Sequence, residues 1–199
     1  MNKLIYNLIS TFTNRSKTIA DEKDKIRQQI RELKKQLTEE QKLKDAELVF
    51  EKIESLPEFK AAKTILLYWS TSTEMSTHNI VEKWCTKKLI VLPAVKDKNL
   101  ILKQYFSSET MEQGPLGIWE PDSLETFYDK VDLVIVPGVA FDLKKNRLGR
   151  GKGFYDRFFK SNNILKIGIG FDFQLLDTIP SDKLDIPMDI IITPSKIIK

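Results

Sequence analysis

The spacing of hydrophobic positions divides the chain into a helical first part and a second part of short apolar runs. In the first part, Ile26, Ile30, Leu33 and Leu37 recur at intervals of four, three and four residues. This period places them on one face of a helix, which we predict over residues 21–37.

A second helix is predicted directly after the first. Thr38 is a suitable N-cap residue, and Gln41, three positions later, would complete a capping box. Val49 and Ile53 give this helix an apolar side, and Pro57 requires it to end before that residue. The first part of the chain is therefore predicted to fold as two consecutive helices.

From Lys63 onward, nearly continuous apolar runs alternate with helical segments. Such runs are typical of strands in parallel sheets that helices cover on both faces. We therefore predict an α/β fold: a single three-layer domain with a mostly parallel sheet flanked by helices. The predicted buried strands are Thr64–Trp69, Leu89–Leu92 (ended by Pro93), Leu133–Val136, Lys166–Gly170 and Ile190–Thr193; Leu100–Phe106 is predicted as an exposed strand, and Thr77–Trp84 and Gly153–Phe159 as helices.

Residues 1–20 differ in composition from the rest of the chain. They contain basic residues and several Ser and Thr, and the first acid is Asp21. Two interpretations remain open, a mitochondrial transit segment and a poorly ordered tail. We expect residues 1–20 to be an N-terminal extension and residues 21–199 a single domain of an intracellular protein, either cytoplasmic or mitochondrial. The apolar residues of the extension would form one stripe on a helix: Leu4, Ile5, Leu8, Ile9 and Phe12.

Composition limits the chemistry that the chain can perform. It has one cysteine, Cys85, and one histidine, His78, which exclude an internal disulfide, a thiolate metal cluster and a multi-histidine metal centre. We interpret both as structural, with Cys85 a small buried residue. No apolar run approaches the roughly 20 residues of a membrane-spanning helix. The net charge of +4 is not by itself a sign of nucleic-acid binding.

The candidate binding segment is Val136–Asp156, VPGVAFDLKKNRLGRGKGFYD. It begins where a buried strand is predicted to end, which is where open α/β sheets bind ligands. Glycines alternate there with basic residues, and backbone amides that lead into a helix form a natural anion site. Three interpretations remain open at this point: a polyphosphate site, a solvated surface turn, and a nucleic-acid site in which Phe154 and Tyr155 stack on bases. The glycines are Gly149, Gly151 and Gly153, and the basic residues are Lys144, Lys145, Arg147, Arg150, Lys152 and Arg157.

The motifs PGVAFD and RLGRGKGFYDRF closely resemble the signature of the 5-formyltetrahydrofolate cyclo-ligase (5,10-methenyltetrahydrofolate synthetase) family. Further segments match the family in the same order: K-x-x-x-R at Lys23 and Arg27, then YWSTSTEMST, LPAV, GIWEP and LDIPMDIIIT. The resemblance covers residues 21–195 and leaves the first 20 residues outside it.

The resemblance implies an enzyme that uses ATP and Mg²⁺ to close 5-formyltetrahydrofolate to 5,10-methenyltetrahydrofolate. ATP would phosphorylate the formyl oxygen, nitrogen 10 would then attack, and ADP and phosphate would be released. Such a reaction needs positioning and charge neutralisation more than a protein nucleophile. The partners would be these two small molecules, without nucleic acid or membrane, and the family leads us to expect a monomer.

The resemblance also implies roles for individual residues. Arg150 and Lys152 would serve catalysis by neutralising charge, and Trp119 is predicted to wall the folate pocket. Arg31 and Lys35 continue the row of basic residues on the first helix and are interpreted as solvated. ATP contacts are expected from Lys23, Arg27, Arg147, Leu148, Gly149, Arg150, Gly151, Lys152, Gly153, Phe154 and Tyr155; folate contacts are expected from Trp69, Glu74, Arg150, Gly151, Lys152, Gly153 and Phe154.

Asp156 and Asp185 are the implied Mg²⁺ ligands, with Asp189 as an alternative to Asp185. Mg²⁺ commonly takes few protein carboxylates and completes its shell with phosphates and waters. From the residues alone, Asp156 is equally well explained as an acid that complements the dipole of a helix, and Asp185 as a loop acid.

Overall fold

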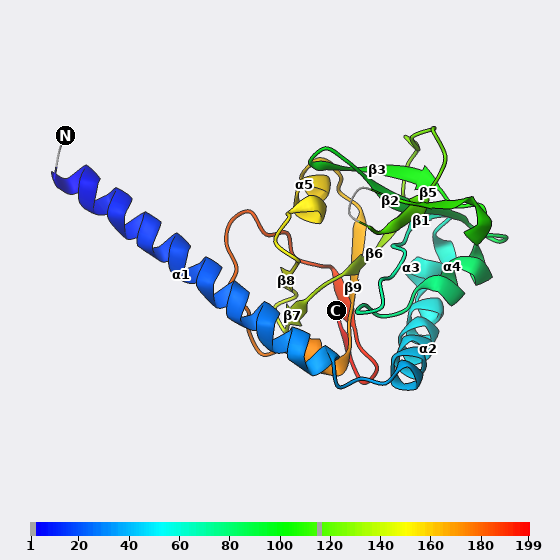
Figure 1. Cartoon of the computed structure of the whole chain (residues 1–199), viewed down its shortest axis with the longest axis horizontal. Helices are drawn as coiled ribbons and strands as arrows, with labels where there is room; N and C mark the ends of the chain where they lie inside the picture. Colours follow the sequence, from blue (N-terminus) through cyan, green and yellow to red (C-terminus); the bar gives the residue numbers. More distant parts are fainter. Residues whose placement is uncertain (1–2, 115–116) are drawn as a thin grey trace.

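A central sheet with helices on both faces forms the body of the protein (Figure 1). The computed structural model describes residues 3–114 and 117–199, with side chains from residue 18 onward. Within that part, seven strands form one sheet in the order β12-β11-β9-β6-β1-β2-β3. The inner strands run parallel, and the edge strands β3 and β12 are antiparallel to their neighbours. The strands are β1 (Thr64–Leu66), β2 (Leu89–Lys96), β3 (Asn99–Gln104), β6 (Leu133–Pro137), β9 (Leu165–Ile169), β11 (Ile190–Ile192) and β12 (Ile197–Ile198).

Smaller elements complete the fold. Two short sheets contain β10-β7-β8 and β4-β5. Their strands are β4 (Met111–Gln113), β5 (Trp119–Pro121), β7 (Ala140–Asp142), β8 (Arg147–Leu148) and β10 (Leu175–Leu176). The helices are α1 (Lys3–Lys34), α2 (Glu39–Ser55), α3 (Pro57–Ala61), α4 (His78–Trp84) and α5 (Phe154–Ser161), with 3₁₀ turns at Ser108–Thr110 and Asp172–Gln174.

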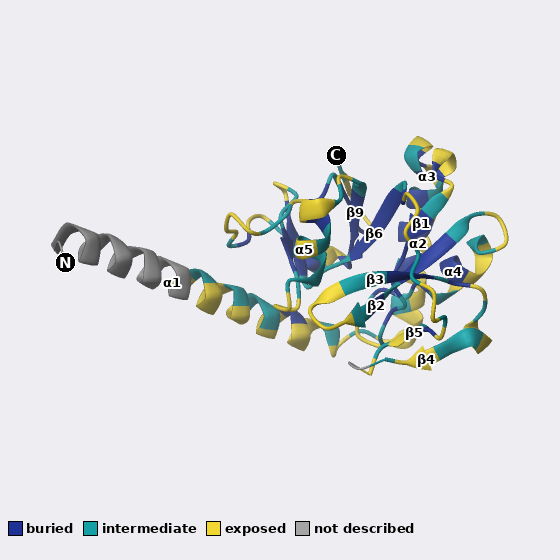
Figure 2. Cartoon of the chain, turned by 90° about the horizontal axis from the view of Figure 1, so that it is seen from above, coloured by how far each residue is buried: buried dark blue, intermediate teal, exposed yellow. Residues whose placement is uncertain are grey.

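Side chains that alternate along the strands divide into two hydrophobic clusters, one on each face of the sheet. On β1, Ile65 belongs to the cluster that includes α2, α3 and α4, whereas Leu66 belongs to the cluster that includes Phe159 of α5. On β6, Ile135 and Val134 divide in the same way. Figure 2 shows β1, β6 and β9 as buried strands between these layers. The predicted three-layer α/β architecture is confirmed.

Pro93 does not end its strand, contrary to the prediction. β2 continues to Lys96 and pairs with β3 along its second half. The carbonyl of Val91 accepts the amide of Leu67 on the side of β1. Pro93 lies two residues later and faces the same side, beyond the end of β1. Its missing N–H therefore costs no ladder hydrogen bond.

The predicted N-cap of α2 is confirmed, but the capping box forms only in half. The amide of Gln41 donates to Thr38 Oγ1 at 3.1 Å. The side chain of Gln41 instead donates to Asp45 Oδ1 at 2.7 Å, because a partner one turn further along the helix competes for it. The helix ends before Pro57 as predicted, and that proline begins the short α3, which the hydrophobic pattern did not indicate.

Helix α1 runs without a break across the boundary expected after residue 20. The predicted apolar stripe of residues 4–12 falls on side chains outside those that the structure describes. Further along, Ile30 is buried against the small sheet that contains β7 and β8. This packing lays the second half of α1 beside the glycine-rich segment. The cluster that Ile30 joins contains Ala140, Leu148 and Ile179.

A buried carboxylate holds the turn between β7 and β8. Asp142 is fully buried and accepts N–H groups of Lys144, Asn146 and Ile179. In the same turn, the carbonyl of Lys145 accepts the amide of Met188 at 2.9 Å. One turn therefore anchors both the glycine-rich segment and the C-terminal acidic segment.

Candidate active site

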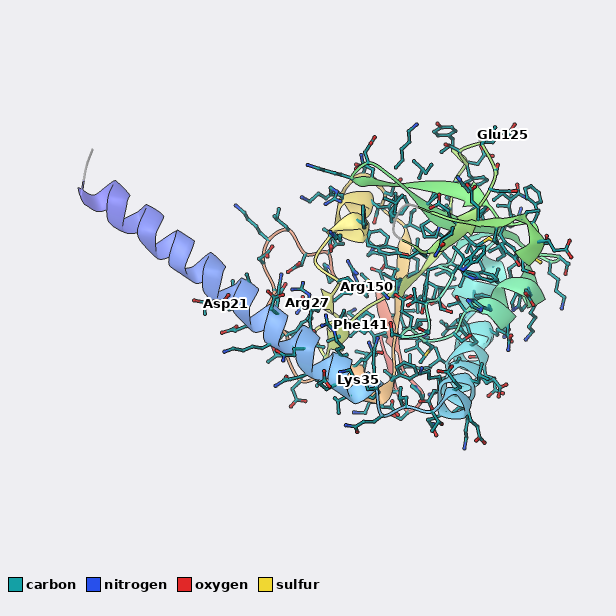
Figure 3. The ribbon with its side chains drawn as sticks, viewed as in Figure 1. Asp21, Arg27, Lys35, Glu125, Phe141 and Arg150 are labelled. Atoms are coloured by element: carbon teal, nitrogen blue, oxygen red, sulfur yellow. The ribbon has the colours of Figure 1, made fainter. Side chains whose placement is uncertain are left out.

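A cavity of about 530 Å³ opens where β1 and β6 end, bordered by β2 and α1. This volume is in the usual range of small-molecule sites. The residues predicted to bind ATP, folate or metal all line it, from Lys23 to Asp185, whereas the alternative ligand Asp189 does not. Figure 3 shows Arg27 and Arg150 in the space between α1 and the sheet.

The glycine loop, Gly149–Gly153, has a backbone that requires glycine. Gly151 has a φ of +92° and Gly153 a φ of +65°, and side-chain-bearing residues rarely adopt such angles. Gly153 is also the N-cap of α5. Nε of Arg27 donates to the carbonyl of Gly149 at 3.0 Å, which fastens the loop to α1. The glycine loop and the N-terminal end of α5 line the cavity, an arrangement that favours an anion.

Arg147 and Asp156 form an ion pair below the glycine loop. Nη2 of Arg147 lies 2.9 Å from Oδ2 of Asp156, and the arginine side chain is 4% exposed. The guanidinium lies 5.4 Å from the ring centroid of Tyr155. Nε of Arg147 and the hydroxyl of Tyr155 are buried without a hydrogen-bond partner among the described residues. Burial raises the pKa of Tyr155, so this hydroxyl keeps its proton at neutral pH.

Lys23 forms a second ion-pair group at the mouth of the cavity. Its Nζ lies 2.6 Å from Oδ2 of Asp185 and 3.1 Å from Oδ2 of Asp182. Burial by itself lowers the pKa of Lys23, but the hydrogen bonds to the two carboxylates outweigh this effect and leave the pKa raised. Lys23 therefore remains charged at physiological pH.

The two predicted metal ligands lie in adjoining parts of the cavity. The amide of Ile186, next to Asp185, donates to Oδ1 of Asp156 at 3.3 Å. Among the described residues no group of three or more metal-binding side chains gathers. Two carboxylates fit Mg²⁺ that is held chiefly by phosphates and waters. Oδ2 of Asp189 instead accepts the amide of Lys166 at 2.7 Å and lies 2.8 Å from Nζ of the same lysine.

Glu74 and Arg150 join the two halves of the site. Oε1 of Glu74 lies 2.8 Å from Nη2 of Arg150. Oε2 of Glu74 accepts the amide and the hydroxyl of Thr71, each at 3.0 Å. A carboxylate predicted to bind folate is therefore in contact with an arginine predicted to bind ATP.

Apolar side chains form the wall of the cavity near Glu74. Trp69 stacks on His78, with ring centroids 4.1 Å apart, and His78 is hydrogen-bonded to the Ser70 carbonyl. Trp119 lines the same cavity and is half exposed, as predicted for a pocket wall. His78 does not line the cavity itself, and its structural role stays a prediction. Cys85 does not line this cavity, and it is only partly buried where a small buried residue was predicted.

Lys34 is a residue near the site that the sequence interpretation missed. Burial lowers its pKa to about 8, with Glu74 acting against this shift and Arg150 and Lys42 adding to it. Lys34 shares with Lys23, Arg27 and Ile30 the face of α1 that meets the body of the protein. Its position four residues after Ile30 was the signal that could have identified it. Arg31 and Lys35 are exposed, as predicted.

Sequence comparison identifies the family of the chain. The profile of the 5-formyltetrahydrofolate cyclo-ligase family matches residues 19–194. The chain belongs to this family. It is thus an ATP-dependent cyclo-ligase of folate one-carbon metabolism, and the alternative of a nucleic-acid-binding protein is not supported.

Individual relatives agree over most of their length. The 5-formyltetrahydrofolate cyclo-ligase of Haemophilus influenzae is 31% identical over 181 residues, covering 85% of this chain and 97% of the relative. The NMR structure of 5,10-methenyltetrahydrofolate synthetase from Aquifex aeolicus has a TM-score of 0.80 and 35% identity, covering 88% of this chain and 91% of the other. The enzyme from Mycoplasma pneumoniae has a TM-score of 0.69 and 25% identity, covering 86% and 98%. A more distant relative from Arabidopsis thaliana, 26% identical over 91% of this chain and 77% of its own length, is named mitochondrial.

Proposed function

We propose that the cavity is where this cyclo-ligase closes 5-formyltetrahydrofolate to 5,10-methenyltetrahydrofolate at the expense of ATP. The observation that carries this proposal is the contact between Arg150 of the glycine loop and Glu74, 2.8 Å apart. It brings a polyphosphate cradle and a folate-binding carboxylate into one cavity. The formyl oxygen can therefore meet the γ-phosphate without a large movement of either ligand.

The chemistry explains why a phosphate donor is needed. A formamide carbonyl is a poor electrophile because its nitrogen donates electrons into it. In the proposed reaction the formyl oxygen attacks the γ-phosphorus and ADP leaves. Nitrogen 10 then attacks the activated carbon, the C–O bond breaks, and phosphate carries the oxygen away. Loss of the proton from nitrogen 10 completes the methenyl bridge.

The glycine loop supplies the proposed triphosphate site. Its backbone amides would donate hydrogen bonds to the phosphate oxygens, and Arg150 and Lys152 would neutralise the charge that develops on these oxygens during transfer. Both side chains are exposed to the cavity. Lys23 and Arg27 would contribute two more positive charges from α1, and Arg147 a buried one from below the loop. Together these positive charges would stabilise the negative charge on the triphosphate during phosphoryl transfer.

We propose Mg²⁺ as the metal of the site, held by Asp156 and Asp185. When bound, Mg²⁺ would supply charge neutralisation to the polyphosphate. The two carboxylates already neutralise Arg147 and Lys23. We therefore expect the metal and the nucleotide to bind together. The metal would replace the positive charges that the two aspartates lose, and the triphosphate would replace the negative charges that Arg147 and Lys23 lose.

The remaining part of the cavity suits the folate. Glu74 can accept hydrogen bonds from the amino group and ring N–H of a pterin, and Trp69 and Trp119 offer apolar surface to aromatic rings.

We further propose that the protein acts as a monomer, and that residues 1–20 are an extension to the catalytic domain. No helix in the described part of the chain has the length and hydrophobicity to cross a membrane. We propose a cytoplasmic or mitochondrial location, and the relative from Arabidopsis thaliana that is named mitochondrial supports the second.

The reaction itself provides the test. Purified protein is mixed with 5-formyltetrahydrofolate, ATP and Mg²⁺, and the near-ultraviolet absorbance of methenyltetrahydrofolate is followed. We expect a rise that depends on ATP and is absent when ATP is omitted. Nucleotide binding without any rise in absorbance would support the phosphate site but would mean that a molecule other than 5-formyltetrahydrofolate accepts the phosphate.

A further inference from the structure

A closed triangle of hydrogen bonds connects the loop after β1 to the glycine loop. Nη2 of Arg150 donates to Thr71 Oγ1 at 3.0 Å and lies 2.8 Å from Glu74 Oε1. The Thr71 hydroxyl donates in turn to Glu74 Oε2 at 3.0 Å. One hydroxyl therefore contacts both the carboxylate proposed to bind folate and the arginine proposed to bind phosphate.

Thr71 itself is held rigidly. Its amide donates to Glu74 Oε2 and its carbonyl accepts the amide of Glu74, both at 3.0 Å. On one side, Ser70 exchanges hydrogen bonds with the buried Thr77. On the other, the carbonyl of Ser72 accepts a hydrogen bond from Lys42 at the start of α2. The hydroxyl of Thr71 is therefore presented from a fixed backbone.

Each of the two ligands would displace a different member of this triangle from its hydrogen bonds. A pterin that donates a hydrogen bond to Glu74 needs Oε1, which Arg150 occupies. A triphosphate that binds Arg150 withdraws the guanidinium from Glu74. Either ligand must break the same ion pair, so the second ligand to bind is spared that cost. Two ligands coupled in this way bind with positive cooperativity.

We propose that Thr71 is a positioning residue that keeps Glu74 in place once Arg150 has turned to the phosphates, and thereby supports the cooperative binding that the shared ion pair creates. This inference rests on the proposed function. When Arg150 leaves, the hydroxyl and amide of Thr71 still hold Oε2 of Glu74, and Oε1 faces the pterin. Without the hydroxyl, the carboxylate keeps one hydrogen bond and can rotate away.

The test compares three variants. Thr71→Val removes the hydroxyl at nearly constant volume, and Thr71→Ser keeps it. Thr73→Val is the matched control, because Thr73 lies exposed in the same loop and its hydroxyl contacts Thr71 at 3.3 Å but neither Glu74 nor Arg150. The dissociation constants of 5-formyltetrahydrofolate and of ADP with Mg²⁺, an unreactive pair, are measured by calorimetry, each alone and each in the presence of the other.

In the wild-type protein we expect each ligand to tighten the other by at least about fivefold. Thr71→Val should weaken folate binding about tenfold, change ADP binding alone by less than about twofold, and reduce the coupling. Thr71→Ser should restore both the affinity and the coupling, and Thr73→Val should resemble the wild type. A loss of folate affinity without a loss of ADP affinity would distinguish a positioning role from a general loss of structure.

Other outcomes overturn the inference. Independent binding of the two ligands to the wild type, or a Thr71→Val variant that behaves like Thr73→Val, removes the role of the hydroxyl. Equal losses of both affinities together with a lower melting temperature would show that Thr71 is merely structural. If the wild type binds neither ligand, the proposed function fails, and this inference fails with it.

Discussion

Arg147 lies 2.9 Å from Asp156, and this pair joins a residue expected to bind ATP to one expected to bind metal. The arginine side chain is 4% exposed and the aspartate side chain 19%. Removing one partner of such a pair leaves an uncompensated buried charge, which is strongly destabilising. Lys23 and Asp185 are paired in the same way, but Lys23 has a second partner in Asp182. The two metal-ligand candidates should therefore respond differently to the same substitution.

Asp185→Asn should raise the Mg²⁺ concentration needed for half-maximal binding of a fluorescent ADP, with little loss of stability. Asp156→Asn should raise it as well and in addition lower the free energy of unfolding by roughly 3 kcal/mol, because Arg147 loses its partner. Magnesium titrations and urea unfolding measure the two effects. Asp189→Asn, which alters a carboxylate outside the cavity, is the control for the titration. An unchanged titration in both site variants would assign the metal to other ligands.

Lys152→Ala should lower kcat about a hundredfold, because a fixed positive charge on the transferring phosphate is lost. The measurement is the steady-state rate of methenyltetrahydrofolate formation at saturating ATP. Lys144→Ala is a matched control, since Lys144 is an exposed lysine of the same basic segment that does not line the cavity. A rate near that of the wild type in Lys152→Ala would remove this residue from the catalytic machinery.

Lys34→Met should stabilise the protein near pH 7 and lose this advantage as the pH rises. Burial lowers the pKa of Lys34 to about 8 in the folded protein, from an ordinary value of 10.5. Between these values the unfolded chain binds more protons than the folded one, so the stability of the wild type rises with pH. Below pH 8 the charged lysine therefore costs a constant amount, roughly 1–3 kcal/mol.

Urea unfolding at pH 7 and at pH 10 measures this difference. Lys35→Met is the control, because Lys35 is exposed and forms only a surface ion pair with Glu32. It should change the free energy of unfolding little at either pH. A stability gain in Lys34→Met that does not vary with pH would mean that better packing, and not relief of a buried charge, is responsible.

The parts of the fold with strong local signals could be predicted from the sequence. The apolar run of β6 has one favoured interpretation and lies where expected. The alternation of the glycine loop indicated where the site lies and left its ligand open. Pro93 was misjudged because whether a proline interrupts a strand depends on the neighbour that its N–H would face. That neighbour, β1, is distant in sequence and ends before Pro93 is reached.

The candidate site was predicted through its motifs and less well through its contacts. The residues of the motifs do line one cavity. Thr71 could not be identified, because a threonine in a loop is an ordinary surface residue until its neighbours are known, whereas the spacing of Lys34 from Ile30 was a usable signal that was missed. The triangle of Thr71, Glu74 and Arg150 joins segments more than 70 residues apart, and no local pattern encodes such a contact.

The ion pair between Lys23 and Asp185 has a consequence for the synthesis of the protein. It connects the first helix of the chain to its last long loop, so the cavity gains its full set of charges only after nearly the whole chain has left the ribosome. A product that terminates before Asp185, or from which a protease removes Lys23, lacks one side of the site. Nucleotide binding can therefore serve as a report of a chain that is intact from Lys23 to Asp185.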